Sequence, residues 1–310
     1  MKIACMLACL LISFYAFSQE EMTTKEKGKR VEIFTSDKAI NATTTTLVGK
    51  GKMDFNVVHH FGDIAGKQGG LSNFFGLDNA TDFRIGFEVG LSDRLDMSIA
   101  RYRGSSVQQK LMELNLKYLV AEQRENDPSH PVSILLFANV VTACSKSSHI
   151  PNTENYFEDF GSRTSNAFAL VIARKMGKVS LQLNPTLVTR GYAISYDQKT
   201  IFALGGAIRF PVSPNMNIIV DYFHPFRSEA SKDSFAVKPA TAIKFSDPLG
   251  IGLEIIKGRH AFHLNFTNSA EIVENRFIPR TVHSWGKGQF RWGFTISRQF
   301  TVWKPKGNKQ

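Results

Sequence analysis

Charged side chains recur inside otherwise apolar segments of this 310-residue chain. Between residues 82 and 91, Arg84 and Glu88 take even positions while apolar residues take the odd ones. On a strand these charges share one face, because successive side chains point to opposite sides. Such groups can pair across strands or line a water-filled pore as a selectivity filter. We call the whole set of candidate lumen-facing residues the wall charges: Asp54, Arg84, Glu88, Asp96, Glu113, Lys117, Asp221, Glu254 and Arg291.

The wall charges leave two interpretations open. A wide water channel holds such groups at little cost, whereas a narrow lumen requires each charge to be paired. In the first case the charges select solutes, and in the second they form a network that fills and stiffens the interior. Spacing along the sequence does not choose between these alternatives.

The histidines do not form a metal-binding pattern. Adjacent His59 and His60 point to opposite faces of a strand, and so do His260 and His263, which are three positions apart. Neither pair can hold one ion alone. We therefore predict no metal site and no cofactor, with solvated or hydrogen-bonded histidines as the default. The remaining histidines lie in or beside predicted loops: His130, His149, His224 and His283.

Catalytic motifs are missing from the sequence as well. It contains no G-x-S-x-G elbow and no H-E-x-x-H pair. The run from Gly49 to Lys52 lacks the spacing of a phosphate-binding loop, and Gly250-x-Gly252 falls within a predicted strand, where it indicates close packing. We predict that the protein is not an enzyme. The alternative is a barrel enzyme that acts on lipid or envelope glycan, with loop histidines as general bases.

The first 18 residues have the features of a secretion signal. Lys2 precedes an apolar run over residues 3–17, and Ala16-Phe17-Ser18 places small residues before a cleavage site near Ser18. The apolar run is shorter than the roughly 20 residues that span a bilayer as a helix. Removal of the signal leaves Cys144 as the one cysteine, so we expect no intramolecular disulfide.

The charge balance is basic without being concentrated. The formal net charge is +11, and loss of Lys2 with the signal leaves 37 basic against 27 acidic residues. The basic residues are scattered over turns and loops, apart from a small cluster at Lys304, Lys306 and Lys309. Nucleic-acid binding needs a concentrated basic surface, so we predict no nucleic-acid partner.

Alternation of apolar and polar residues extends over most of the chain. It predicts strands that approach the roughly 9 to 11 residues needed to cross a bilayer. We therefore expect an all-β protein, an antiparallel up-and-down transmembrane β-barrel of about 12 strands. A secreted, soluble β-sandwich that binds a ligand is the structural alternative. The predicted strands cover 52–61, 82–91, 94–102, 109–120, 131–142, 164–174, 178–190, 201–210, 216–223, 247–256, 260–268 and 289–300.

Long and short connections alternate between the predicted strands. Outer-membrane barrels have short turns at the periplasmic end and longer loops outside, so both termini should lie in the periplasm. The exceptions are 103–108, short for an outer loop, and 121–130, long for an inner turn, and they could mark a miscounted strand. The predicted barrel covers 52–303, with a basic tail at 304–310.

Residues 19–51 do not share the strand pattern. They begin with charged and polar residues and include the small polar run Asn41–Thr46, which has little capacity to form a core. We favour a mobile periplasmic arm for this segment. The alternative is a plug that folds into the lumen.

Motifs along most of the mature chain, in the same order, resemble a family of uncharacterised bacterial outer-membrane β-barrel proteins defined only as a domain of unknown function. Two departures stand out: His60 occupies a position that is often basic in the family, and the chain continues past Phe300 and Trp303. The resembling stretches are 59–62, 75–80, 84–86, 170–175, 181–188, 202–205, 263–269, 285–288 and 293–298.

The resemblance implies a barrel in the outer membrane of a Gram-negative-type bacterium, without a reaction or catalytic residues. Together with the alternation, it predicts a porin-like or transporter-like pore, or a surface scaffold without catalysis. The expected partners are outer-membrane lipid and a small solute in the lumen. The sequence gives no oligomeric state.

Overall fold

The computed structural model describes residues 28–104, 106–237 and 243–304. The predicted signal peptide (1–18) and most of the predicted tail (304–310) lie outside these residues. No helix in the described ranges is long and apolar enough to cross a membrane. The helices are α2 (Glu229–Val237), α3 (Glu274–Arg280) and the short 3-10 helices η1 (Leu71–Gly76), η2 (Gly161–Arg163) and η3 (Trp285–Lys287). The strands are β1 (Lys52–Asp63), β2 (Ala80–Gly90), β3 (Leu95–Gly104), β4 (Lys110–Ala121), β5 (Ser133–Ala143), β6 (Thr164–Met176), β7 (Val179–Arg190), β8 (Thr200–Ser213), β9 (Met216–Phe226), β10 (Leu249–Lys257), β11 (His260–Thr267) and β12 (Arg291–Thr301).

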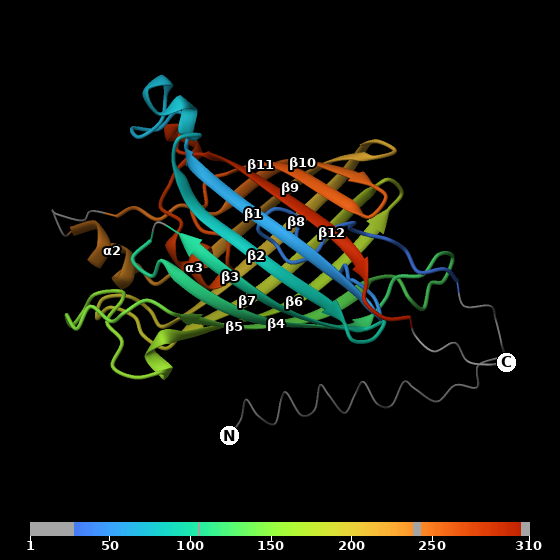
Figure 1. Cartoon of the computed structure of the whole chain (residues 1–310), viewed down its shortest axis with the longest axis horizontal. Coiled ribbons are helices and arrows are strands. Elements are labelled where there is room, and N and C mark those ends of the chain that lie inside the picture. The colour runs from blue at the N-terminus through green and yellow to red at the C-terminus, as the bar shows by residue number, and fades with distance from the viewer. Residues whose placement is uncertain (1–27, 105, 238–242, 305–310) are drawn as a thin grey trace.

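The twelve strands form one closed barrel (Figure 1). Each strand pairs antiparallel with its neighbours in sequence, and β12 returns to pair with β1 from Lys52↔Thr301 to Asp63↔Arg291. Closure removes the free sheet edges, which is what allows a β-structure to cross a bilayer. The predicted up-and-down barrel of twelve strands is confirmed.

The strand ends also follow the sequence closely. Every predicted strand occurs, and no end differs from its prediction by more than three residues. The largest shifts are in β8, which continues past Pro211 to Ser213, and in β9, which reaches Phe226. Pro211 is tolerated because the β8–β9 register shifts between Pro211 and Ser213, at the end of the hairpin.

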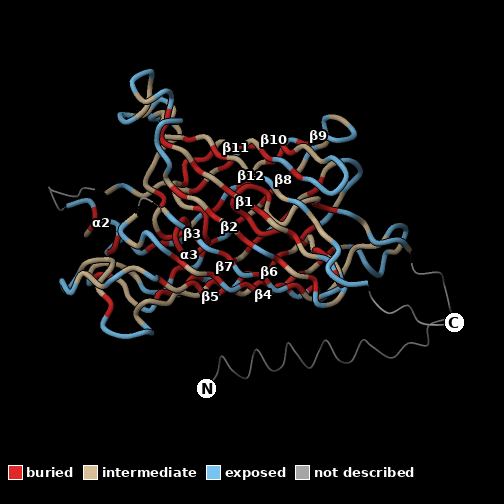
Figure 2. Tube along the Cα trace, in the orientation of Figure 1, coloured by how far each residue is buried: buried red, intermediate tan, exposed pale blue. Residues whose placement is uncertain are grey.

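Buried and more exposed residues alternate along the strands of the wall (Figure 2). In β3, Met97 and Ile99 are exposed while Ser98 and Ala100 are buried. The exposed members are mostly large and apolar, which in water would be costly and in hydrocarbon is favourable. This outer surface therefore suits lipid. Its exposed residues include Leu114, Leu116, Leu136, Phe168, Leu183, Phe202, Ile208 and Ile218.

The two ends of the barrel differ as predicted. The long loops lie at one end, and the described chain begins and ends at the other, beside the short turns (Figure 1). The long inner turn, 122–132 between β4 and β5, is not a miscounted strand. It binds the start of the described chain instead: Val31 N donates to Gln123 O at 2.9 Å, and Glu125 N donates to Lys29 O at 2.9 Å.

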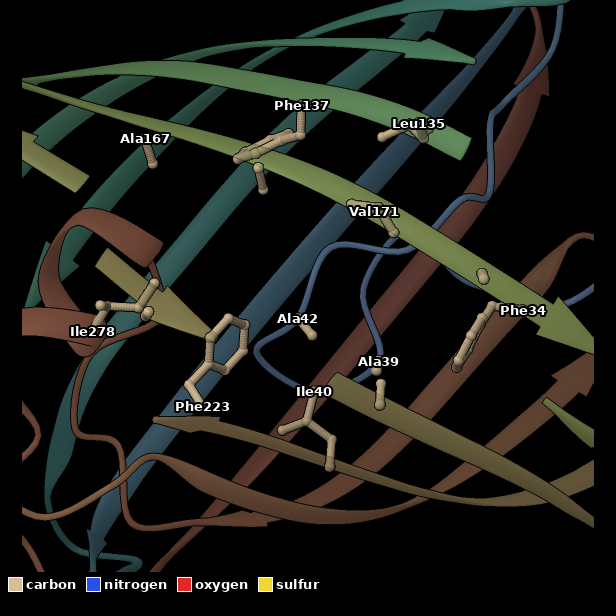
Figure 3. Packing of buried hydrophobic residues seen from close by; sticks show 14 of the residues in the cluster. Phe34, Ala39, Ile40, Ala42, Leu135, Phe137, Ala167, Val171, Phe223 and Ile278 are labelled. Carbon is tan, nitrogen blue, oxygen red and sulfur yellow. The ribbon is translucent and has the colours of Figure 1, made fainter. Parts of the chain in front are cut away.

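The inner face is not uniformly polar, contrary to the pattern expected from alternation alone. Strands β5–β9 carry apolar residues on the inside, among them Phe137, Val171 and Phe223. They pack against residues from the N-terminal part of the chain, such as Phe34 and Ile40 (Figure 3). The barrel thus has an apolar core on one side of its lumen, and lipid covers only the opposite face of these strands.

Candidate functional site

Two segments occupy the lumen. The first, residues 31–48, we call the lumen segment; the second is the loop 268–290 between β11 and β12, which carries α3 and which we call the mouth loop. Most residues of the lumen segment are buried, including Ala42 and Thr44, which have no exposed surface. In α3, Asn275 also has no exposed surface, and Phe277 is 1 % exposed. The interior is therefore filled with protein from both ends.

The position of the lumen segment differs from the mobile arm favoured for residues 19–51. Its described residues match the alternative, a segment folded into the barrel. The physical reason is that alternating small and apolar residues, such as Ala39 and Ile40, pack on the apolar inner wall, while their backbone polar groups find partners on the strands. Neither kind of contact is local in sequence.

Asp221 of β9 is the main anchor of the lumen segment. Its Oδ2 accepts hydrogen bonds from the backbone N–H groups of Ile40 at 3.1 Å, Asn41 at 2.5 Å and Ala42 at 2.7 Å. The same stretch forms a tight turn in which Ala39 N donates to Ala42 O at 2.9 Å. A carboxylate that receives several N–H groups satisfies a buried turn that would otherwise lack acceptors.

Polar side chains of β7 hold the other parts of the segment. Ser180 Oγ donates to Ile33 O at 2.6 Å, and both Gln182 Nε2 and Asn184 Nδ2 donate to Thr43 O at 2.8 Å. These groups fall at alternate positions of one strand, so all three reach the lumen. The segment is thus fixed by hydrogen bonds from the wall as well as by apolar packing.

Glycines in β10 make room for the turn. A side chain at Gly250 would place its Cβ 2.9 Å from Ile40 Cγ2 and 2.7 Å from Asp221 Oδ1. At Gly252 the nearest atom is Asn265 Oδ1, at 2.5 Å. The Gly250-x-Gly252 pattern therefore reflects close packing, as the sequence indicated.

All of the wall charges lie inside the barrel wall and are buried, with exposed fractions of 9 % or less. The partners of Arg84 illustrate how they are compensated. Arg84 Nη2 lies 3.4 Å from Glu113 Oε2, Arg84 Nε donates to Tyr102 Oη at 2.8 Å, and Tyr102 Oη donates to Glu113 Oε2 at 2.6 Å. Asn139 Nδ2 donates to the other Glu113 oxygen at 3.2 Å. This arrangement corresponds to the paired network and not to a row of free charges.

Lys117 links the wall to the lumen segment. Its Nζ lies 3.0 Å from Glu88 Oε1 and also forms an ion pair with Asp37. Asp96 Oδ2 accepts a hydrogen bond from Val48 N at 2.5 Å. Lys117, Glu88 and Asp96 thus contact the lumen segment or each other near the end of the barrel that carries the short turns.

The remaining wall charges have separate surroundings. Arg291 Nη2 donates to Asp63 Oδ1 at 2.9 Å, which ties β12 to the end of β1. Asp54 accepts a weak hydrogen bond of 3.5 Å from Asn56 Nδ2 and also interacts with Ser297 of β12. Glu254 receives Arg209 Nε at 3.2 Å. The sequence did not indicate the partners of these side chains.

Glu254 also belongs to the arrangement that comes nearest to hydrolytic chemistry. Ser36 Oγ donates to Glu254 Oε1 at 2.7 Å and lies 2.9 Å from His263 Nε2. In a catalytic triad the acid holds the histidine nitrogen that is far from the serine. Here Glu254 Oε1 approaches the same nitrogen, Nε2, at 3.3 Å, and Nδ1 faces Ala39 O at 3.1 Å. The three side chains therefore anchor the lumen segment and are not aligned as a triad.

The two members of each strand pair differ in burial: His60 and His263 are buried, whereas His59 is partly exposed and His260 is exposed. Within the described parts of the chain, no three His, Cys, Asp or Glu side chains are placed to hold a metal ion. His130 pairs with Asp127 at 2.7 Å in the turn between β4 and β5, and His224 at the end of β9 pairs with Asp247 at 2.9 Å.

The lumen segment and the mouth loop meet at Glu274 of α3. Lys38 Nζ lies 2.6 Å from Glu274 Oε1, and Thr43 Oγ1 donates to the same oxygen at 2.9 Å. Glu274 is 3 % exposed. A single carboxylate on the loop thus contacts two residues of the segment that comes from the opposite end of the barrel.

Arginines surround Asp197 at the outer mouth, a feature that the sequence analysis missed. Arg190 Nη1 lies 2.9 Å from Asp197 Oδ2, Arg280 Nη2 lies 3.8 Å from it, and Arg227 forms an ion pair with Oδ1. Burial alone would raise the pKa of Asp197, but Arg190 and Arg227 outweigh it and hold this pKa below its usual value. The carboxylate therefore stays ionised at neutral pH.

α3 contributes Arg280 to this cluster and places a second arginine, Arg276, one helix turn away. Arg276 Nε lies 2.8 Å from Glu271 Oε2 and its Nη2 lies 3.6 Å from Glu154 Oε2, while Arg280 forms an ion pair with Glu154. The one sequence signal for this cluster is the spacing of four between Arg276 and Arg280, which places both on one helix face. Loop arginines carry no such periodicity.

Little free space remains beside the lumen segment. Two cavities that border Ser36 and Asp37 have volumes of about 30 and about 50 Å³. A water molecule needs at least roughly 10 to 15 Å³ by this kind of measure, so each cavity holds a few waters at most. The described conformation is closed at this level of the barrel.

His283 in the mouth loop gives a pH-dependent prediction. Burial, and then the nearby Arg291, lower the pKa of His283 from 6.5 to about 4. Between pH 6.5 and 4 the opened loop binds a proton that the packed loop does not, so packing should weaken as the pH falls through this range. We expect faster proteolysis of the mouth loop at pH 5 than at pH 7, and little such difference in His283→Gln.

The control for this prediction is His149→Gln, which alters an exposed histidine on another loop. It should retain the pH dependence of the wild type. Equal acceleration at pH 5 in His283→Gln and in the wild type would show that another group controls the loop.

The closed barrel, its lipid-facing apolar band and its buried charged interior together define an integral outer-membrane β-barrel. The chain belongs to the family DUF5777, described as a membrane bound beta barrel domain, whose model matches residues 34–300. The match begins within the lumen segment. The predicted family and the outer-membrane location are confirmed.

Comparison with solved structures finds other outer-membrane barrels. KdgM porin is 8 % identical, covers 80 % of this chain and 99 % of its own, and has a TM-score of 0.47. NanC porin is 6 % identical over 80 % of this chain and 98 % of its own, with a TM-score of 0.45. Outer membrane phospholipase A from Escherichia coli is 7 % identical over 81 % and 93 %, with a TM-score of 0.39. These likenesses are too distant to assign a solute or a reaction. Comparison with curated protein sequences gives no match.

Proposed function

We propose that the protein is a gated, non-enzymatic pore of the outer membrane that admits small polar solutes when the lumen segment leaves the barrel. The observation that carries this proposal is the direct β1–β12 pairing, which closes the wall without help from the lumen segment. The segment can therefore depart while the barrel stays intact. Outer-membrane lipid covers the apolar band, and the solute is the partner on the inside.

The nature of the contacts supports a reversible closure. Besides its apolar packing, the lumen segment is attached by hydrogen bonds and ion pairs from Asp221, Gln182 and Lys117. Water can solvate these polar groups equally well once the segment leaves. If the attachment were purely apolar, departure of the segment would leave a lumen wall that water does not solvate. The buried wall charges would instead line a hydrated passage.

Catalysis is not part of the proposal. Ser36 and Glu254 both contact the same nitrogen of the His263 imidazole, Nε2. A catalytic triad uses both ring nitrogens, so this arrangement does not activate the serine as a nucleophile in the manner of a triad. Hydrolysis of outer-membrane lipid that disappears in Ser36→Ala would contradict this part of the proposal.

The contact between Lys38 and Glu274 offers a direct test of gating. Lys38→Glu and Glu274→Lys each place like charges together at the junction between the lumen segment and the mouth loop. Each should raise the open probability in planar bilayers by about tenfold or more, since like charges in contact cost at least about 1.4 kcal/mol at low dielectric. The double variant Lys38→Glu with Glu274→Lys restores opposite charges, so its open probability should return to that of the wild type.

The double variant serves as the internal control, because it contains both substitutions. If it conducts as much as either single variant, this contact does not hold the gate. If all three variants and the wild type stay silent under every voltage, and a variant without the lumen segment is silent too, the pore itself is contradicted.

A further inference from the structure

A small polar pocket lies at the outer mouth, between α3 and the ends of β6 and β7. It is lined by Arg163, Arg190, Arg276 and Arg280, together with Glu154 and Tyr192. Arg163 and Arg190 come from the ends of η2 and β7, and Arg276 and Arg280 lie one turn apart in α3. The fold therefore brings the four arginines together here. The pocket belongs to the interior of the mouth and not to the lipid-facing wall.

Positive charge exceeds negative charge around this pocket. Among the residues that line it, four guanidinium groups face one carboxylate, that of Glu154. The other acidic groups, Asp197 and Glu271, lie behind the arginines and pair with them. Arg227 adds a further positive charge on Asp197. Together these groups are five arginines and three carboxylates, so their net charge is positive.

Two of the arginines hold unused donors in spite of their burial. Both side chains are only 9 % exposed. Their Nε atoms, Arg190 Nε and Arg280 Nε, are buried and have no hydrogen-bond partner among the described residues. A buried N–H group without an acceptor is costly, and most such groups in folded proteins have a partner. An acceptor that enters the pocket would remove this cost.

The half-buried Arg163 has its side chain already positioned by the fold. Its Nη1 donates to Ser145 O at 2.6 Å, and its guanidinium carbon lies 4.7 Å from the centre of the Phe157 ring. Such contacts fix the planar group and leave its other N–H donors for a ligand. Planar guanidinium groups recognise carboxylate and phosphate oxygens by paired hydrogen bonds.

The volume of the pocket limits the size of the ligand that it can bind. Its volume is about 20 Å³, on a scale where a single water needs roughly 10 to 15 Å³. There is room for the charged end of a molecule and not for a whole sugar or lipid. We infer that this arginine pocket binds the carboxylate or phosphate group of an anionic solute at the outer mouth. The inference deepens the proposed function, on which it rests, by naming the class of solute.

Binding can be measured without reference to conductance, so its failure would be distinguishable from failure of the pore. We suggest titrating the full mature protein with inorganic phosphate in a non-ionic detergent, by calorimetry at constant ionic strength. Wild-type protein should bind in a saturable manner. Arg163→Gln and Arg190→Gln should each weaken binding at least tenfold, while Arg163→Lys should recover part of the loss because it restores charge without the planar fork.

Arg174→Gln is the matched control, since Arg174 is an exposed arginine at the opposite end of the barrel. It should bind phosphate as the wild type does. Heat-modifiable migration on gels checks that each variant is folded. Arg163→Gln is the safer variant because the hydrogen bonds of the Arg163 side chain reach backbone carbonyl groups.

Two outcomes would overturn the inference. One is phosphate binding that does not saturate, or that is equal in the wild type and both glutamine variants. The other is the absence of phosphate binding together with retention of lipopolysaccharide that depends on Arg163 and Arg190, which would assign the pocket to a lipid headgroup instead of a soluble anion.

Discussion

Deletion of residues 31–48 is expected to turn a quiet barrel into a continuously open pore. Hydrogen bonds from Ser180, Gln182 and Asn184, together with the Asp221 carboxylate, hold the segment in place. At about 1 kcal/mol net for each of these four attachments, the closed state is favoured by roughly 4 kcal/mol, about a thousandfold. Planar-bilayer recordings should therefore show rare openings in the wild type and stepwise permanent conductance in the deletion variant.

The deletion also exposes the apolar inner face of β5–β9, so a milder variant is needed. Asp221→Ala keeps the whole segment but removes the acceptor of three backbone N–H groups. We expect its open probability to rise between about tenfold and a hundredfold, at roughly 1 to 3 kcal/mol for buried groups left without partners. The control is Asp54→Ala, a buried wall carboxylate that has no hydrogen bond to the lumen segment in the described structure.

The two variants separate gating from general damage. If Asp54→Ala opened the barrel as often as Asp221→Ala, the conductance would report a weakened wall and not a released segment. If the deletion variant folded, by its heat-modifiable migration, and stayed silent, the lumen segment would have a structural role only.

The barrel could be predicted because its determinants are local. Alternation in stretches such as 82–91 fixes both the strand and the face that each side chain takes, and adjacent hairpins fix the topology. This information is present in a single sequence. It was sufficient for the strand order and for the strand ends to within three residues.

The contents of the lumen could not be predicted in the same way. Asn41 and Asp221 are 180 positions apart, so their contact leaves no periodic trace. One signal was available: the segment 133–143 is apolar on both faces, with Leu135 and Phe137 inside and Leu136 and Val140 outside. A barrel strand that is apolar on both sides indicates that protein packs against its inner face. This pattern would have favoured the plug over the arm.

The arginine pocket escaped prediction for a related reason. Arg163, Arg190 and Arg280 come from the end of a loop, the end of a strand and a helix, where the period of two no longer applies. Their convergence depends on how the mouth loop folds back into the barrel. Residues of this kind are visible only once the loops have been placed.

Loss of Glu113 should have the largest effect on stability of any single wall charge. Its side chain is fully buried and receives Arg84, Tyr102 and Asn139. Glu113→Ala leaves the Arg84 guanidinium buried without its counter-ion, which typically costs about 3 to 5 kcal/mol. We expect a marked fall in the urea midpoint for unfolding from lipid vesicles, with a lower temperature for the heat-modified shift on gels.

A double substitution distinguishes an unpaired charge from a simple cavity. Because replacing both members of a buried ion pair by apolar groups of similar volume is often close to neutral, Arg84→Met with Glu113→Leu should recover most of the stability that Glu113→Ala loses. Glu229→Ala, which removes one partner of the exposed Lys232–Glu229 pair, should leave the midpoint unchanged. If the double variant were as unstable as Glu113→Ala, the network would contribute through the shape of its side chains, and the pairing of buried charges would not be what maintains the wall.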